Sequence, residues 1–249
     1  MDGTVLALFL ATTFVGGVVS GVAGFALGLV VSGVWLHILT PTQTATLIVL
    51  NALLTQTYAI WRLRHSLSWR AAAPYVIGGV AGTPIGTALL TYVDPSAVRT
   101  GVGVLIVAYG ILGLARPTFR PMQQTGRAAG VTVGVFNGVL GGLTGLVGIV
   151  IAIWCQWRGW PKDIQRSVFQ PVMLAAAVVG AASLGVAGAI TVETMKLYLL
   201  GVPLLIAGLW TGFRLYGKLD DDAFRRIILV LLLASGLALI VPLSSLGLR

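Results

Sequence analysis

The sequence predicts an all-α integral membrane protein made of two homologous halves that form inverted repeats. Three observations support this prediction: the composition, a glycine pattern that occurs twice, and the placement of the basic residues. Hydrophobic residues make up 57% of the 249 residues and charged residues only 9%. Because a helix needs about 20 apolar residues to cross a hydrocarbon core of about 30 Å, the long uncharged runs, such as 3–61, predict a multi-pass protein of the cell (inner) membrane.

A repeated glycine ladder divides the chain into halves. Four glycines with the spacing G-x3-G-x2-G-x3-G occur twice, 117 residues apart. They are Gly17, Gly21, Gly24 and Gly28, and then Gly134, Gly138, Gly141 and Gly145. Self-similarity of this kind indicates a duplicated membrane unit. We therefore expect a first membrane repeat at 1–117, a cytoplasmic linker at 118–127 and a second membrane repeat at 128–249.

Each half is expected to contain one laddered segment and three ordinary membrane helices. The ordinary helices are expected near 42–61, 70–92, 97–115, 164–189, 195–213 and 225–243. As single helices, the laddered segments 4–36 and 128–157 would run about 50 Å and about 45 Å, well beyond the bilayer core. We therefore expect each to be broken at its glycines into two half-helices that form a re-entrant segment. One steeply tilted long helix per half is the alternative.

The basic residues favour the re-entrant arrangement. If every segment crosses the membrane once, the 16 Lys and Arg residues divide equally between the two sides. If each laddered segment returns to the side from which it entered, 13 of the 16 lie on one side. These 13 occupy the loops 62–70, 116–127, 158–166 and 214–226. The positive-inside rule then makes that side cytoplasmic, and three full crossings per half invert the second half relative to the first. A dual-topology dimer would also explain an equal division.

The membrane segments contain neutral polar residues but no deeply placed carboxylate, which argues against a carboxylate ion relay. Ser20 and Asn137 hold equivalent positions in the two ladders. With backbone N–H groups freed at the breaks, they form a candidate anion-binding cradle. The candidate substrate-binding residues are Ser20, Gly21, Gly24, Asn51, Gln56, Asn137, Gly138, Gly141, Thr144, Arg166 and Gln170. For the polar residues the alternative role is hydrogen bonding between helices, and for Arg166 it is anchoring at the headgroups.

Other function classes find little support in the sequence. The net charge of +9 is explained by loops that face anionic lipid, so no nucleic acid partner is expected. Cys155 stands alone, and His37 and His65 are too far apart for a metal cluster. No cofactor is therefore expected. The chain shows neither the Ser/His pairing of a membrane protease nor a Walker motif, so we do not expect an enzyme.

Four motifs resemble the TauE/SafE family of sulfite exporters and sulfur-anion or sulfonate permeases. They are G-V-V-S-G-V-A-G-F-A-L-G (17–28), G-V-F-N-G-V-L-G-G-L-T-G-L-V-G (134–148), R-G-W-P-K-D-I-Q-R (158–166) and G-L-W-T-G-F-R-L-Y-G-K-L (208–219). The resemblance runs over essentially the whole chain. The proline-flanked G-x-G-G-G that is common in the family is absent from both ladders, which leaves the particular anion open.

The resemblance implies a membrane permease or exporter of a small anion such as sulfite, thiosulfate or an organosulfonate. Inverted repeats with broken helices further suggest alternating access at a glycine-ladder site near the bilayer midplane. An anion channel and a non-transporting scaffold subunit are the alternatives. The expected partners are the small anion, the lipid bilayer and, as one option, a second copy of the chain in a homodimer.

Overall fold

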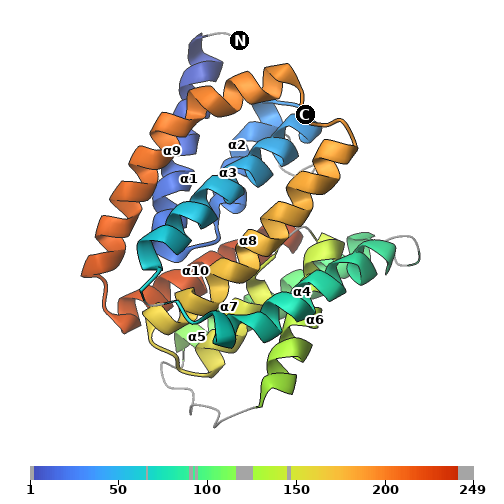
Figure 1. Ribbon diagram of the computed structural model, residues 1–249, viewed down its shortest axis with the longest axis vertical. Coiled ribbons are helices and arrows are strands. Elements are labelled where there is room, and N and C mark those ends of the chain that lie inside the picture. The colour runs from blue at the N-terminus through green and yellow to red at the C-terminus, as the bar shows by residue number, and fades with distance from the viewer. Residues whose placement is uncertain are drawn as a thin grey trace. The chain divides into compact units, whose positions relative to one another are not determined.

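The computed structural model describes residues 3–65, 67–89, 92, 95–115, 126–144 and 147–240. Across these residues the chain forms ten α-helices and no strand (Figure 1), which confirms the predicted all-α class. The helices are α1 (Gly3–Ala23), α2 (Leu27–Ile38), α3 (Pro41–Leu63), α4 (Trp69–Leu89), α5 (Pro95–Ala115), α6 (Arg127–Thr144), α7 (Ile149–Trp157), α8 (Lys162–Val186), α9 (Val192–Lys218) and α10 (Asp221–Ile240). The predicted linker lies outside the described residues except at its last two positions.

Six of these helices, α3, α4, α5, α8, α9 and α10, occupy the six segments predicted as ordinary membrane helices. Local sequence signals explain where two of them begin. Thr40 and Gln43 form a reciprocal capping box at the start of α3, with both hydrogen bonds at 3.2 Å and Pro41 in the first turn. At the start of α9, Thr191 Oγ1 accepts a hydrogen bond from the backbone N–H of Thr194 at 3.2 Å.

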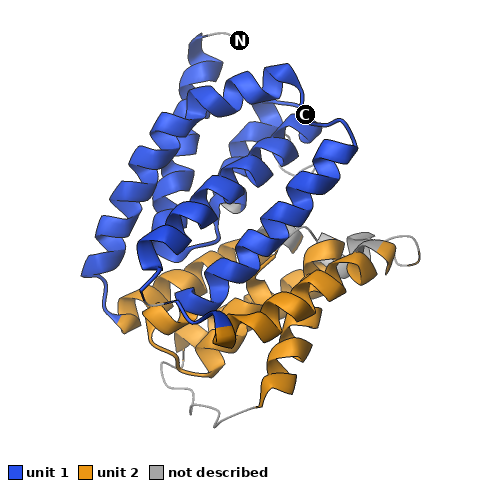
Figure 2. Ribbon diagram, in the orientation of Figure 1, with its two compact units in different colours: residues 1–69, 166–220 blue, residues 70–165, 221–249 orange. Residues whose placement is uncertain are grey.

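Two compact units make up the chain, and neither coincides with a half of the sequence (Figure 2). Unit 1 contains residues 1–69 and 166–220, and unit 2 contains residues 70–165 and 221–249. Each unit therefore holds one glycine ladder together with helices from both halves. A sequence repeat does not have to form a compact body by itself, so the division into repeats at 1–117 and 128–249 stays a prediction.

In unit 1, the first laddered segment forms a helical hairpin. Helix α1 ends at Ala23 and α2 begins at Leu27. Trp35 of α2 stacks on Phe9 of α1 with ring centroids 5.0 Å apart, and its Nε1 donates to Thr12 Oγ1 at 2.9 Å. Helix α2 thus runs back toward the N-terminal end of α1, and the single-long-helix alternative is wrong. The expectation of two half-helices is also wrong for α1, because its 21 residues span about 31 Å.

Ladder glycines let helix backbones approach closely inside each unit. A Cβ at Gly21 of α1 would lie 2.8 Å from the Cα of Gly212 in α9. In unit 2, a Cβ at Gly138 of α6 would lie 2.8 Å from the backbone nitrogen of Thr83 in α4, and one at Gly86 of α4 would lie 2.8 Å from the Cα of Val139 in α6. Such contacts are possible only without a side chain. Gly21 and Gly138, which hold the same place in the two ladders, therefore both lie where another helix backbone approaches closely.

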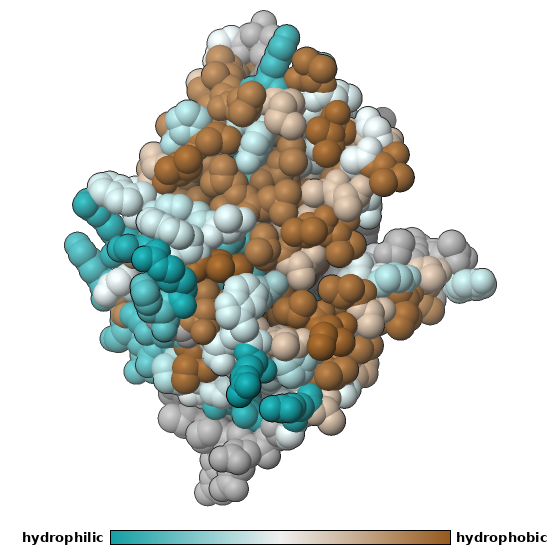
Figure 3. All heavy atoms as spheres, in the orientation of Figure 1, coloured by the Kyte–Doolittle hydropathy of each residue, from teal (hydrophilic) through white to brown (hydrophobic). Residues whose placement is uncertain are grey.

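The molecular surface is largely apolar, as a bilayer requires. Large hydrophobic side chains such as Ile77 (63% exposed) and Leu105 (72% exposed) face outward, whereas soluble proteins keep exposed apolar patches small. In Figure 3, apolar side chains cover most of the visible face of unit 1, and hydrophilic ones gather where α3 and α9 end. Among the described residues, α1, α3, α8 and α9 are long and apolar enough to span a membrane.

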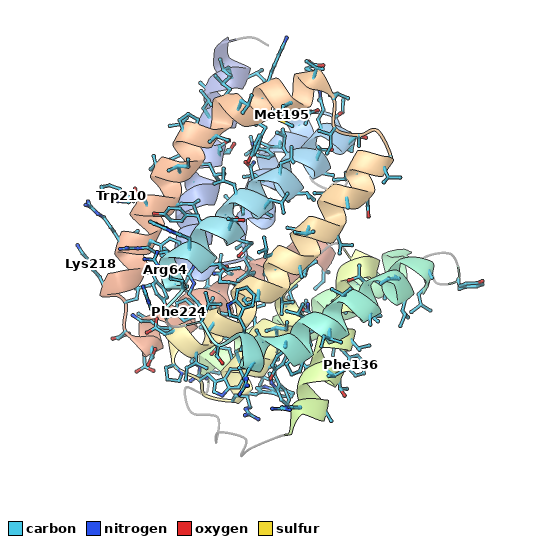
Figure 4. All side chains as sticks on the ribbon, viewed as in Figure 1. Arg64, Phe136, Met195, Trp210, Lys218 and Phe224 are labelled. Carbon is cyan, nitrogen blue, oxygen red and sulfur yellow. The ribbon has the colours of Figure 1, made fainter. Side chains whose placement is uncertain are left out.

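One end of unit 1 is basic. Arg64 and Lys218 lie together at the end where α3 and α9 finish, and Met195, near the start of α9, lies at the opposite end (Figure 4). Arg214, also exposed, stacks over the Trp210 ring with its guanidinium carbon 3.4 Å from the centroid. Arginine and tryptophan side chains in this arrangement are typical of the headgroup level of a membrane.

Candidate functional site

The first glycine ladder is interrupted at Gly24, which has a φ of +93°. Side chains strongly disfavour this conformation, so the sequence can turn here only with glycine. The N–H of Gly24 donates to Ser20 O at 2.8 Å and completes the last turn of α1. Helix α2 then begins at Leu27 without a side-chain cap. The N–H groups of its first turn have no acceptor within the helix, and they give this end of α2 a partial positive charge.

Arg166, one turn into α8, brings a full positive charge to the same place. It is only 1% exposed, so its role as a headgroup anchor is excluded. Its guanidinium carbon lies 4.6 Å from the Phe213 ring centroid and 4.4 Å from the Tyr216 ring centroid, both on α9. Its Nη2 donates to Ser20 O at 3.4 Å. Two aromatic rings and a backbone carbonyl thus position and stabilise the buried cation.

Gln170 and Gln56 connect Arg166 to the break. In the amide orientation that satisfies its neighbours, Gln170 Oε1 accepts from Arg166 Nε and Nη2, both at 3.3 Å, and Gln170 Nε2 donates to Gln56 Oε1. Gln56 Nε2 in turn donates to Gly24 O at 2.9 Å. A Cβ at Gly24 would lie 2.9 Å from the Gln170 amide and 3.5 Å from Arg166 Nε. The Gly24 site, defined here as Ser20, Gly24, Gln56, Arg166 and Gln170, is therefore one connected polar cluster.

The electrostatic balance of the described residues favours an anion at this site. Arg166 is the only charged side chain among them that is buried. Their carboxylates, Asp163, Glu193, Asp220, Asp221 and Asp222, are all exposed. Asp2 and Asp94 fall outside the part of the chain that the structure describes. A buried cation in a membrane protein marks a functional site by default.

The second ladder is interrupted later than the first. Gly141, the counterpart of Gly24, lies within α6, and the positive φ of +99° belongs to Gly148, directly before α7. Asn137 is 1% exposed, and its Oδ1 accepts from the N–H of Gly148 at 3.0 Å. A Cβ at Gly141 would lie 3.0 Å from Val147 Cγ2. The second break therefore contains neutral polar groups of unit 2.

The predicted site residues thus separate into groups. Five of them meet in the Gly24 site, and Asn137 and Gly141 lie at the second break. Gly21 and Gly138 pack against α9 and α4, and this packing accounts for both glycines without a ligand. Asn51 is buried on α3 with no hydrogen-bond partner for its Oδ1 among the described residues. The side chain of Thr144 is outside the described part of the structure.

Sequence reasoning missed the aromatic partners of Arg166. Phe213 and Tyr216 are three residues apart on α9, directly after Gly212, which packs against α1. The spacing places both rings on one face of the helix, and this signal was present in the sequence. The pairing of that face with α8 was not, because it depends on contacts between helices far apart in the chain. In the described residues, no group of three or more His, Cys, Asp or Glu could hold a metal ion.

Comparisons with known proteins give one consistent result. Residues 8–239 match the family model described as sulfite exporter TauE/SafE. The chain is 26% identical over 230 residues to a protein of Cupriavidus necator named "Probable sulfite/organosulfonate exporter TauE", and the alignment covers 90% of this chain and 89% of that protein. No solved structure matches the chain.

Proposed function

This chain belongs to the sulfite exporter TauE/SafE family, and we propose that it moves sulfite, thiosulfate or an organosulfonate across the cell membrane by alternating access. The family is one of membrane transporters rather than enzymes, and the chain is accordingly a multi-pass membrane protein. The observation that carries the proposal is Arg166, a buried cation placed at a helix break. The charge and the hydrogen-bond donors of the Gly24 site are those that a small oxyanion requires.

The anion is proposed to bind beside Arg166, Gln56 and Gln170, near the first turn of α2. A guanidinium presents several N–H donors in one plane and can bind an oxyanion through two of them, and the Phe213 and Tyr216 rings fix the position of this plane. An opposite charge about 4 Å away is worth about 4 kcal/mol at an effective dielectric constant of 20. Outward movement of one negative charge releases about 2.3 kcal/mol per 100 mV of inside-negative potential, so export needs no coupled ion.

The directions of the packed helices support inverted repeats. In unit 1, α3 and α8 are antiparallel, because Gln56 contacts Gln170 while Val49 lies near Gly180. In unit 2, α5 and α10 are antiparallel, as the contact of Gly110 with Leu233 and the approach of residues 107 and 236 indicate. Each pair joins corresponding helices of the two halves. Two copies related by an axis in the membrane plane run in opposite directions, and alternating access would move such repeats about their glycine breaks.

The helix directions also predict a membrane topology. Because α3 and α8 are antiparallel, the loops near Arg64 and Lys162 are expected on the same, cytoplasmic side, with Lys196 outside. Arg64→Cys, Lys162→Cys and Lys196→Cys, each made in a Cys155→Ser background, can be labelled with an impermeant thiol reagent. We expect only the cysteine at position 196 to react in intact cells, and all three after permeabilisation. Labelling that places positions 64 and 162 on opposite sides would contradict the re-entrant arrangement.

Flux through the purified protein tests the proposed function directly. Proteoliposomes should take up radiolabelled thiosulfate, and unlabelled sulfite and methanesulfonate should compete more strongly than acetate or lactate. Liposomes without protein are the control for leakage. Absence of protein-dependent flux with every sulfur anion would refute the proposal, and ion currents far above transporter turnover would identify a channel.

A further inference from the structure

The second break offers hydrogen-bond donors of a different kind from those at Arg166. Helix α7 has nine residues and begins directly after Gly148, which supplies no side-chain cap. The N–H groups of the first turn, at residues 149–151, have no acceptor within the helix and carry a partial positive charge. Ile149 and Ile151 are almost completely buried, so this positive end lies inside unit 2. Buried helix N-termini of this kind can bind anions.

Asn137 supplies the second observation. Its Oδ1 accepts from the Gly148 N–H at 3.0 Å, so the amide lies at the start of α7. Its Nδ2 is buried and has no hydrogen-bond acceptor among the described residues. An aspartate would cap a helix at least as well, because a negative charge is favoured at its N-terminus. The feature that asparagine adds is a donor, and a buried donor needs an acceptor.

We propose that the Asn137 amide and the first turn of α7 form a second anion-binding position, built from unit 2 alone. The inference rests on the proposed function, since the ligand is the same class of small sulfur oxyanion. Here only neutral donors bind the anion, and charge-assisted hydrogen bonds are stronger than neutral ones. The anion should therefore bind this position more weakly than the Gly24 site, by about tenfold or more. A transported anion would then have two binding positions, one of high affinity and one of low affinity.

Equilibrium binding of radiolabelled thiosulfate to the purified full-length protein tests this inference. We expect two binding phases in the wild type. Asn137→Asp keeps the acceptor for Gly148 but replaces the donor with a negative charge, which should weaken the low-affinity phase about a thousandfold and leave the high-affinity phase in place. Arg166→Gln should instead weaken the high-affinity phase and leave the low-affinity phase in place. Acidic pH should restore part of the lost phase in Asn137→Asp, because protonation removes the charge.

The outcomes separate this inference from the proposed function. A single phase that Arg166→Gln removes and Asn137→Asp leaves unchanged overturns the second position but keeps the proposed function. Loss of both phases in a normally melting Asn137→Asp protein also overturns it, because the two positions would then be one. No binding to the wild type overturns both proposals. If Asn137→Asp does not fold, Asn137→Leu can replace it, because leucine is similar in size and lacks a donor. Asn137→Leu should also weaken the low-affinity phase and leave the high-affinity phase in place.

Discussion

Replacing Arg166 with glutamine is expected to lower the affinity for thiosulfate about a thousandfold and to reduce flux below detection at submillimolar substrate. An opposite charge about 4 Å away contributes about 4 kcal/mol at an effective dielectric constant of 20, which corresponds to this factor. Arg166 is buried between Phe213 and Tyr216, so water would not replace the lost charge. Flux and equilibrium binding, measured on protein of verified melting temperature, check this expectation.

Two matched variants sharpen the Arg166 experiment. Arg166→Lys keeps the charge but loses the planar group that stacks on the rings, so it should recover only part of the affinity. Arg214→Gln removes an exposed arginine on α9 that stacks over Trp210, and it should bind thiosulfate almost as the wild type does. If Arg214→Gln and Arg166→Gln lost the same amount of affinity for thiosulfate, general surface charge, rather than the Gly24 site, would attract the anion.

Gly24→Leu is expected to abolish transport. The φ of +93° at Gly24 is strained for any side chain, and a Cβ there would lie 2.9 Å from the Gln170 amide. Backbone strain of this kind costs about 1–3 kcal/mol, and the displaced amide would release Gln56 from the Gly24 carbonyl and Gln170 from Arg166. Thiosulfate flux in proteoliposomes, with melting temperature as the readout of folding, checks the result.

Gly33→Leu is the matched control for Gly24→Leu. Gly33 lies on the neighbouring helix α2, where an added Cβ meets no atom within 4 Å, so this variant should fold and transport as the wild type does. Gly24→Ala should lose part of the thiosulfate flux, because it introduces the same backbone strain as Gly24→Leu but a smaller side chain. Wild-type flux in both Gly24 variants would remove the first break from the mechanism.

Much of the fold could be predicted because a bilayer imposes simple rules on sequence. Apolar run length located the six ordinary helices, and the first glycine ladder located the break at Gly24. The second ladder did not predict the position of the second break, at Gly148 rather than Gly141. Several glycines there can adopt a positive φ, and helix packing selects one of them. The unequal lengths of α1 and α2 were missed for a similar reason, because contacts such as Phe9 with Trp35 determine where the hairpin turns.

The sequence by itself determined that this is a multi-pass helical membrane protein, and it identified the family through the order of its motifs. The division into two related halves stays a prediction. Only the tertiary structure decided where the side chain of Arg166 lies. Near a helix end, the side chain of an arginine can reach the lipid headgroups or turn inward. The neighbouring residues in the sequence are compatible with both orientations. The inward state is stabilised by Ser20 of α1 and by Phe213 and Tyr216 of α9. These partners are distant in the chain, and only folding brings them together around one buried charge.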